Sequence, residues 1–255
     1  MFQAEREKCI LNCLAREHIV SPARIQELTK SSIATVRRDL TSMEQRGLVI
    51  RSHGYVQLPE TSLRLMQPPL ADEKERIAEA AAAQIHDGDT IFLGSGTTCS
   101  CLARHLKGKR GLHIVTINLD VVQNLVQLPD VSVSILGGEV RVEQGYVETM
   151  DEYTIQILKR LYFDKVFVTV NGIDFQYGYS IRLQLQLTLF QYLLQNSKAF
   201  YCVADSSKFN RRTYMQFCPI DAIRYVVTTE EVRRKYAEQF ARSNIQVITT
   251  QSGAL

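Results

Sequence analysis

The sequence lacks long hydrophobic runs and an export signal. No stretch of eighteen apolar residues occurs, which excludes a membrane-spanning helix. The first eight residues already contain acidic and basic side chains, which is not typical of a secretory signal peptide. We therefore expect a cytoplasmic protein that has no membrane partner.

The usual spacings of metal-binding residues are also absent. The six cysteines form no CxxC motif, the five histidines form no HxxxH motif, and no histidine lies beside a cysteine pair. Without an export signal, the cysteines are expected to be free thiols in a reducing compartment. The sequence therefore predicts no metal site and indicates no cofactor.

Charge is unevenly distributed along the 255 residues, a length that allows one large domain or two unequal ones. Residues 1–58 hold nine Lys and Arg and six Asp and Glu, whereas the remaining residues hold 21 of each sign. The whole formal excess of +3 therefore lies in the first quarter of the chain. This asymmetry favours a small module that meets a polyanion, joined to a domain with another task.

The N-terminal quarter has the pattern of a helix-turn-helix. Residues 2–17 carry one apolar stripe, Ser21-Pro22 is typical of a helix start, and Ser32 caps a third helix that ends before Gly47. The segments 48–51 and 55–58 are expected to form a hairpin, or wing. The third helix would lie in the major groove, and the wing would reach phosphate or the minor groove.

Candidate DNA contacts combine hydroxyl and cationic side chains, which suit phosphates and base edges. They are Ser31, Ser32, Thr35, Arg37, Arg38, Arg51 and His53. The alternative is an ordinary solvated helix face, since pairs of arginines are common on protein surfaces.

Three of the six prolines fall in residues 59–71, which we interpret as a linker. The predicted domains are a winged helix-turn-helix over residues 1–58 and a sensor domain over residues 72–255. Residues 62–66 are expected to form a short helix within the linker.

Beyond the linker, short apolar strands alternate with helices, which predicts an α/β domain with a parallel, doubly wound sheet. Strands are expected at 90–93, 113–116, 132–136, 165–170, 199–204, 225–228 and 246–249, and helices at 73–85, 99–106, 120–128, 183–195 and 231–243. Ligands of such sheets bind at the carboxyl ends of the strands, near a switch in strand order. Each polar or glycine-rich cluster of this region directly follows a strand, which favours a ligand pocket at that edge.

The segment Gly94-Ser95-Gly96-Thr97-Thr98 is typical of an anion-binding turn before a helix. Cys99 replaces the third glycine of a dinucleotide fingerprint, and no Gly-Lys-Ser/Thr of a P-loop is present. A small phosphate ester is thus the expected ligand, and a tight turn without a ligand is the alternative. Further candidates, each of which is also explained by turn chemistry or surface position, are Asn118, Gly137, Gly138, Asn171, Gly172, Asp174 and Lys208.

Several motifs resemble those of the deoxyribose-regulator (DeoR) family of bacterial transcription factors. They are residues 32–40 (SIATVRRDL), 44–54 (EQRGLVIRSHG), 88–98 (GDTIFLGSGTT), 135–141 (ILGGEVR), 163–165 (FDK), 171–174 (NGID) and 204–209 (ADSSKF). The resemblance implies a winged helix-turn-helix followed by a sensor domain that resembles ribose-5-phosphate isomerase and binds a phosphorylated sugar effector. It further implies a repressor of a carbohydrate operon that binds a double-stranded DNA operator as a homodimer or homotetramer.

The sensor domain departs from the family pattern at several positions. Ile117-Asn118-Leu119 stands where the family usually has Thr-Asn-Ser, residues 178–181 (GYSI) stand where it has a Gly-Leu-Thr-Thr-like stretch, and Gln184 and Gln186 replace acidic residues. The family usually has Asp where Gly94 stands, and residues 144–149 (QGYVET) lack its usual Val-Gly-Pro.

An isomerase-like enzyme fused to a DNA-binding module is the competing hypothesis. Isomerisation needs a carboxylate base near the substrate carbon. Asn171 stands where the isomerases that this fold resembles have an Asp, and residues 136–139 (LGGE) lack the lysine of their Lys-Gly-Gly-Gly loop. The sequence therefore predicts a regulator with no catalytic residues; a DNA-binding protein without a ligand is the third possibility.

Overall fold

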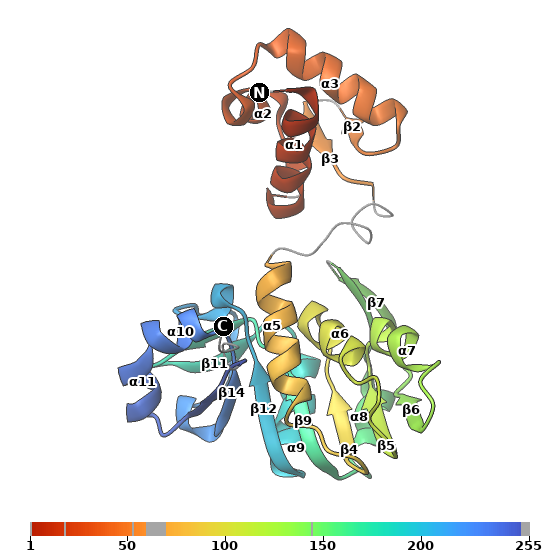
Figure 1. The fold of residues 1–255 in the computed structure, drawn as a ribbon, viewed down its shortest axis with the longest axis vertical. Coiled ribbons are helices and arrows are strands. Elements are labelled where there is room, and N and C mark those ends of the chain that lie inside the picture. The colour runs from red at the N-terminus through yellow and green to blue at the C-terminus, as the bar shows by residue number, and fades with distance from the viewer. Residues whose placement is uncertain (1, 18, 53, 60–69, 144, 251–255) are drawn as a thin grey trace. The chain divides into compact units, whose positions relative to one another are not determined.

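The computed structural model describes residues 2–17, 19–52, 54–59, 70–143 and 145–250 (Figure 1). The chain divides into two compact units, Met1–Pro69 and Leu70–Leu255. Most of the predicted linker, including the short helix expected at residues 62–66, lies outside the described residues.

The N-terminal unit contains three helices and a small antiparallel sheet of strand order β1-β3-β2. The helices are α1 (Gln3–Glu17), α2 (Pro22–Thr29) and α3 (Ile33–Gln45), and the strands are β1 (Ile19–Val20), β2 (Ile50–Ser52) and β3 (Tyr55–Gln57). The expected starts of α2 and α3 are confirmed, because the Ser21 and Ser32 side chains accept hydrogen bonds from backbone amides of the first turns. Gly47 follows α3 with a φ of +68°.

The core of this unit joins all three helices to the wing. It contains fully buried side chains from each helix and from β3, namely Ile10, Leu14, Ile25, Val36, Leu40, Met43 and Val56. The stripe predicted on the first helix is confirmed, since Cys13 is buried there as part of this core. Strand β1 was not predicted, because its two residues pair with β3 only through tertiary contact.

The C-terminal unit is built on a seven-stranded parallel sheet of order β15-β14-β12-β9-β4-β5-β6, as the alternation of strands and helices predicts. Its strands are β4 (Thr90–Leu93), β5 (Leu112–Thr116), β6 (Val131–Ile135), β9 (Phe163–Val168), β12 (Ser197–Val203), β14 (Tyr225–Val227) and β15 (Gln246–Ile248). The chain first builds outward from β4 to β6 and then returns to add β9 on the other side of β4. The switch in strand order therefore lies between β4 and β9.

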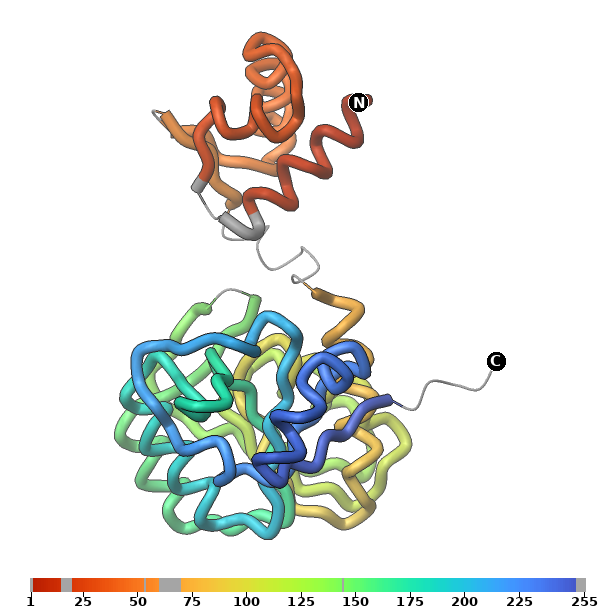
Figure 2. Tube along the Cα trace, turned by 90° about the vertical axis from the view of Figure 1, so that its left-hand side faces the viewer, coloured from red at the N-terminus to blue at the C-terminus, as the bar shows by residue number. Residues whose placement is uncertain are grey.

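Helices cover both faces of this sheet (Figures 1 and 2). They are α5 (Ala71–Ala82), α6 (Thr97–Arg104), α7 (Leu119–Leu125), α8 (Glu152–Leu158), α9 (Gln184–Gln195), α10 (Glu230–Lys235) and α11 (Ala237–Arg242). Two separate apolar clusters result: Ile91 and Leu93 of β4 pack in the cluster of α5, α6 and α7, and Phe92 packs in the cluster of α8, α9 and α11. This alternation is the pleat of a strand that is buried on both sides.

Several short elements depart from the sequence-based expectation. A hairpin of β7 (Val140–Glu143) and β8 (Tyr146–Thr149) and helix α8 follow β6, and a small antiparallel sheet contains β10 (Gly172–Asp174), β11 (Gly178–Ile181) and β13 (Met215–Cys218). The helix predicted over residues 231–243 is divided into α10 and α11 at Tyr236. Strands of three or four residues are too short to show an apolar alternation, which explains why they were missed.

Candidate functional sites

Helix α3 presents two cationic side chains to solvent. Arg37 and Arg38 are exposed, and within the described part of the chain neither guanidinium forms a hydrogen bond or ion pair. Ser32 and Thr35 lie at the start of the same helix, where the Ser32 Oγ accepts from the Thr35 amide at 3.2 Å and lies 2.9 Å from its Oγ1. Ser31 donates its hydroxyl to the Thr29 carbonyl at 3.2 Å.

The opposite face of α3 is held by a buried ion pair. Asp39, with an exposed fraction of 3%, accepts from Arg6 Nε at 2.7 Å and from its Nη2 at 3.1 Å. The bidentate geometry ties α3 to α1 and leaves Arg37 and Arg38 on the outer face. Arg46, just after α3, forms a second link to α1, with 2.7 Å between its Nη2 and the Glu7 carboxylate.

Among the described residues, the wing contributes one cationic side chain close to α3. Arg51 of β2 donates to the Thr41 Oγ1 at 2.9 Å and lies 3.7 Å from the Glu44 carboxylate. These contacts hold Arg51 against the end of α3. His53, the other predicted wing residue, lies outside the described residues.

In the C-terminal unit, the segment Gly94–Thr98 leaves β4 at the switch in strand order and enters α6. The Gly94 amide donates to the Phe167 carbonyl of β9 at 2.8 Å, and a Cβ on Gly94 would lie 3.1 Å from Val168 Cγ1. Gly96 precedes α6 with a φ of +98°, and a Cβ there would lie 2.9 Å from Thr169 Oγ1. Glycine thus lets this segment pass close to β9 while the amides of the first turn of α6 remain at the edge of the sheet.

Asn118 holds this segment from the neighbouring strand. Its buried side chain donates to Ser100 Oγ at 3.1 Å and to the Gly96 carbonyl at 3.4 Å, and its Oδ1 accepts from the Asp120 amide at 2.9 Å. The structure therefore places Asn118 beside the predicted anion-binding turn, where its polar atoms already have protein partners.

Gly137 and Gly138 follow β6 and lie against the start of α8. The Gly137 carbonyl accepts from Thr154 Oγ1 at 2.6 Å, and a Cβ on Gly138 would lie 2.6 Å from the same atom and 2.9 Å from Asp151 Oδ1. Close packing thus explains the glycine at position 138. A Cβ on Gly137 would meet no atom within 4 Å.

The side chains of Asn171 and Asp174 also form hydrogen bonds with other protein groups. The Asn171 Oδ1 accepts from the Arg182 amide at 3.1 Å, and a Cβ on Gly172 would lie 2.4 Å from the Arg211 carbonyl oxygen. Asp174 pairs with Arg212 at 2.9 Å, and this pairing holds the pKa of the Asp174 carboxyl below its usual value.

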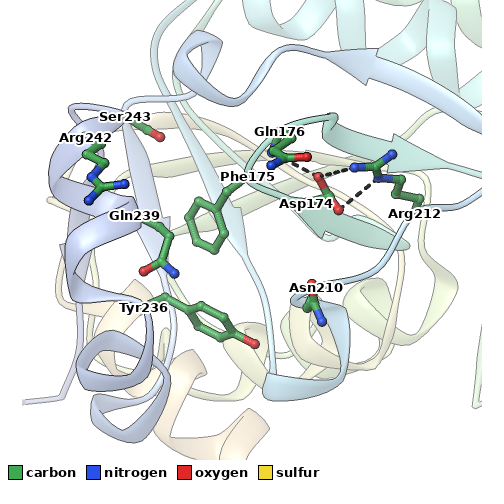
Figure 3. Close-up of a pocket in the computed structure, with 9 residues that line it drawn as sticks. All are labelled: Asp174, Phe175, Gln176, Asn210, Arg212, Tyr236, Gln239, Arg242 and Ser243. Carbon is green, nitrogen blue, oxygen red and sulfur yellow. Dashed lines mark hydrogen bonds and ion pairs between the residues drawn. The ribbon is translucent and has the colours of Figure 1, made fainter.

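Asp174 also lines a pocket of about 510 Å³. The pocket lies between the 174–176 turn and helix α11, and its wall includes Phe175, Tyr236 and Gln239 (Figure 3). No residue of Gly94–Thr98 lines it. Of the predicted effector residues, the structure therefore places only Asp174 in this pocket.

Lys208 lies in the short helical turn Ser206–Lys208 that follows β12. Asp205, which is buried, caps this turn by accepting from the Ser207 amide at 3.0 Å. Glu73 of α5 accepts from both the amide and the hydroxyl of Ser206 at 2.8 Å. These contacts bring the first turn of α5 to the carboxyl end of β12.

Lys74 joins Lys208 at this position, although the sequence-based reasoning did not select it. Its exposed fraction is 8%, and its pKa is lowered chiefly by burial, with Asp205 opposing this effect and Lys208 adding to it. The available signal was its place three residues before Ile77, on the buried stripe of α5. A lysine on an apolar stripe, close to a second lysine, is suited to bind an anion.

Glu148 is the second residue that sequence-based reasoning missed. It is fully buried on β8 and accepts a hydrogen bond from Ser95 Oγ. Burial raises the pKa of the Glu148 carboxyl, and the hydrogen bond from Ser95 acts in the opposite direction. The signal in the sequence was the acidic residue within the segment 144–149, which lacks the family's usual Val-Gly-Pro.

Burial raises the pKa of the Cys99 and Cys218 thiols to about 12. A thiol of this kind is a weak nucleophile at neutral pH.

Across the described ranges, no group of three or more His, Cys, Asp or Glu side chains is arranged to hold a metal ion. No helix there is long and apolar enough to cross a bilayer.

A helical unit with exposed arginines on α3, joined to a parallel-sheet unit with polar groups at its strand ends, is typical of two-domain DNA-binding regulators. Residues 6–62 match the family described as DeoR-like helix-turn-helix domain, and residues 70–230 match the DeoR C terminal sensor domain. The chain belongs to the DeoR family of transcriptional regulators, as its sequence motifs predict.

Curated relatives match over nearly their whole length. The glycerol-3-phosphate regulon repressor of Escherichia coli is 30% identical over 239 residues, which cover 89% of this chain and 91% of the relative. The lactose phosphotransferase system repressor of Streptococcus mutans is 31% identical over 245 residues, covering 89% and 92%. These relatives are repressors and not enzymes, which agrees with the expected regulator.

Among solved structures, ribose 5-phosphate isomerase A from Methanocaldococcus jannaschii is similar with a TM-score of 0.37 and 16% identity, over 54% of each chain. A likeness of this strength supports no argument about activity.

Proposed function

We propose that the chain represses an operon of carbohydrate metabolism, and that a phosphorylated sugar bound in the C-terminal unit controls its affinity for DNA. The names of the relatives, a glycerol-3-phosphate regulon repressor and a lactose phosphotransferase system repressor, support this class of operon. The observation that carries the effector site is the position of Gly94–Thr98, Lys74 and Lys208 at one edge of the sheet.

For DNA, α3 would enter the major groove with its first turn toward the bases. Arg37 and Arg38 are exposed on that helix and suit guanine edges or phosphate oxygens. Ser31, Ser32 and Thr35 would contact the backbone beside them. Arg51 and His53 of the wing would contact phosphate or the minor groove.

For the effector, the phosphate would bind between the first turn of α6 and the two lysines. Strands β4 and β12 are both neighbours of β9, so their carboxyl ends lie about 10 Å apart, or two strand spacings. Thr97 and Thr98 would supply hydroxyls on one side, with the backbone amide of Ser95, whose own hydroxyl donates to Glu148. Lys74 and Lys208 would supply positive charge on the other side. A bound dianion would offset the cost of burying the Lys74 ammonium.

The remaining predicted residues would position this site. Asn118 holds Gly96, the Gly137 carbonyl accepts from Thr154, and the glycines at 138 and 172 allow close packing of the segments around the site. Asn171 and Asp174 would fix the turn that follows β9.

Two or more copies would pair to present their recognition helices to half-sites about one DNA turn apart. The effector would bind one arrangement of the copies better and so shift the population away from the DNA-binding one. A cytoplasmic location fits both ligands.

The test combines a DNA-binding and a ligand-binding measurement on the full chain. Fluorescence anisotropy with the DNA upstream of the chain's own and adjacent genes should detect binding that falls with rising salt. A thermal-shift screen of sugar phosphates should then find a compound that raises Tm and releases the DNA. Binding to none of these duplexes at low ionic strength would contradict the proposal, as would DNA binding that no phosphorylated sugar alters.

A further inference from the structure

The β7–β8 hairpin holds an unusual pair of side chains beside the proposed effector site. Arg141 of β7 and Glu148 of β8 are directly opposite in the register of the hairpin, so their side chains lie on the same face. Among the described residues no ion pair joins the two, although the positive charge of Arg141 acts to lower the pKa of the Glu148 carboxyl.

Each of these side chains contains a buried polar atom that lacks a partner. Arg141 Nε and Glu148 Oε1 are both shielded from solvent, and neither has a hydrogen-bond partner among the described residues. A buried donor or acceptor left in this state costs free energy, which a bound group can recover. The other oxygen of Glu148 accepts from Ser95, a residue of the anion-binding turn.

The hairpin is also in contact with the turn at a second point. Gly145 has a φ of +85°, and a Cβ there would lie 2.9 Å from Cγ2 of Thr97. Glu148 Oε1 and Arg141 Nε therefore belong to a hairpin that contacts the Gly94–Thr98 segment, where the phosphate would bind.

We propose that Glu148 and Arg141 form a subsite for a hydroxyl group of the effector, which makes Glu148 a specificity-determining residue of the sensor domain. A hydroxyl donates one hydrogen bond and accepts another, so one group satisfies both Glu148 Oε1 and Arg141 Nε. The subsite rests on the proposed effector site and narrows its ligand to a phosphate ester that carries a hydroxyl within reach of the phosphate. Both atoms are shielded, so the subsite requires the hairpin to separate from the turn before a hydroxyl can enter.

The test compares matched ligands that differ by one hydroxyl. The affinities of the full chain for glycerol 3-phosphate and 3-hydroxypropyl phosphate, and for ribose 5-phosphate and 2-deoxyribose 5-phosphate, are measured by calorimetry together with that for inorganic phosphate. We expect the chain to prefer the hydroxylated member of at least one pair by about tenfold or more, since the lost hydrogen bond leaves a buried group unpaired.

Substitutions then locate the source of this preference. Glu148→Leu should bring the ratio of the two affinities close to one, and Glu148→Gln, which keeps an acceptor oxygen, should retain part of it. Glu143→Leu is the matched control, because Glu143 is exposed on the same hairpin, and the ratio should stay as in the unmodified chain. If Glu148→Leu does not fold, as judged by its melting curve, an unchanged ratio in Glu148→Gln decides against the subsite.

The outcomes separate this inference from the proposed function. An unchanged ratio in Glu148→Leu, with inorganic phosphate still bound, overturns the subsite alone and means that a buried water or nothing bridges the two side chains. Absence of any preference within both ligand pairs in the unmodified chain has the same meaning. Failure of every phosphorylated probe to bind overturns the proposed effector site and the subsite together.

Discussion

The two units of the chain present their polar residues in opposite ways. In the N-terminal unit, Arg37 and Arg38 extend from a helix into solvent, and the buried Asp39–Arg6 pair fixes the helix from behind. In the C-terminal unit, Asn118 and Asp174 already bind other protein groups. A surface that binds a polyanion needs exposed charged side chains on a rigid helix. A site for a small ligand also needs surrounding residues that bond to one another and hold the few ligand-binding groups in place.

The largest expected effect comes from removing the exposed charges of helix α3. Arg37→Ala combined with Arg38→Ala should lower operator affinity by about 100-fold, because each lost base or phosphate contact costs about 1–3 kcal/mol. Fluorescence anisotropy at fixed salt measures the loss. Lys8→Ala removes the same kind of charge from the exposed face of α1 and should have a much smaller effect. Equal losses of operator affinity for the α3 variant and the α1 variant would contradict a specific role of α3 in DNA binding.

The second prediction concerns Lys74, one of the side chains proposed to bind the effector phosphate. Lys74→Met keeps the length of the side chain but loses its charge, and should weaken binding of inorganic phosphate and of sugar phosphates by about 10- to 100-fold. Operator affinity without effector should be retained. Calorimetry gives the first value and anisotropy the second. Lys107→Met, at an exposed position beyond the end of α6, serves as the control. Loss of DNA binding in Lys74→Met would mean that this lysine is structural.

The third prediction tests the scaffold. Gly172→Ala places a Cβ 2.4 Å from the Arg211 carbonyl oxygen and should lower the stability of the C-terminal unit by about 1–3 kcal/mol. That cost corresponds to a fall in Tm of about 2–4 °C for each kcal/mol. Gly137→Ala meets no atom within 4 Å, and its melting temperature should stay close to that of the unmodified chain. Calorimetric melting distinguishes them, and equal shifts would contradict the close approach at Gly172.

The smallest expected effect concerns pH. Burial raises the pKa of Glu148 above its unfolded value, so its contribution to stability is present at acidic pH and is lost as the pH rises through the raised pKa. Glu148→Gln should therefore raise Tm slightly at pH 8 and leave it nearly unchanged near pH 4.5. Melting curves across this range measure the difference. A constant difference at all pH values would show that the carboxyl does not titrate there.

The sequence predicted best those features that local chemistry determines. Ser21 and Ser32 mark helix starts, and the apolar stripes of the first and third helices are the core of their unit, because capping and periodicity act over a few residues. The parallel sheet followed from the alternation of strands with helices. Strand β1 and the β7–β8 hairpin were missed, because such short segments are strands only through partners that folding brings to them.

The candidate site was predictable only in part. The segment Gly94–Thr98 has a local signature, and the structure places it at the switch between β4 and β9. Lys74 precedes this segment by twenty residues, and Glu148 follows it by fifty. Neither lies in a motif. The packing of α5 brings Lys74 to the carboxyl end of β12, and the packing of β8 brings Glu148 to Ser95.

The burial of the central sheet on both faces limits how a signal can leave the sensor unit. Phe92 is packed on one side and Ile91 and Leu93 on the other, so sliding β4 would open voids in two dense cores at once. Rearrangement on ligand binding is then expected at the strand ends, where Glu73 of α5 bonds Ser206 and Ser95 bonds Glu148 of the hairpin. Helix α5 begins at Ala71, so a change in its first turn acts on the part of the C-terminal unit that is nearest along the chain to the N-terminal unit.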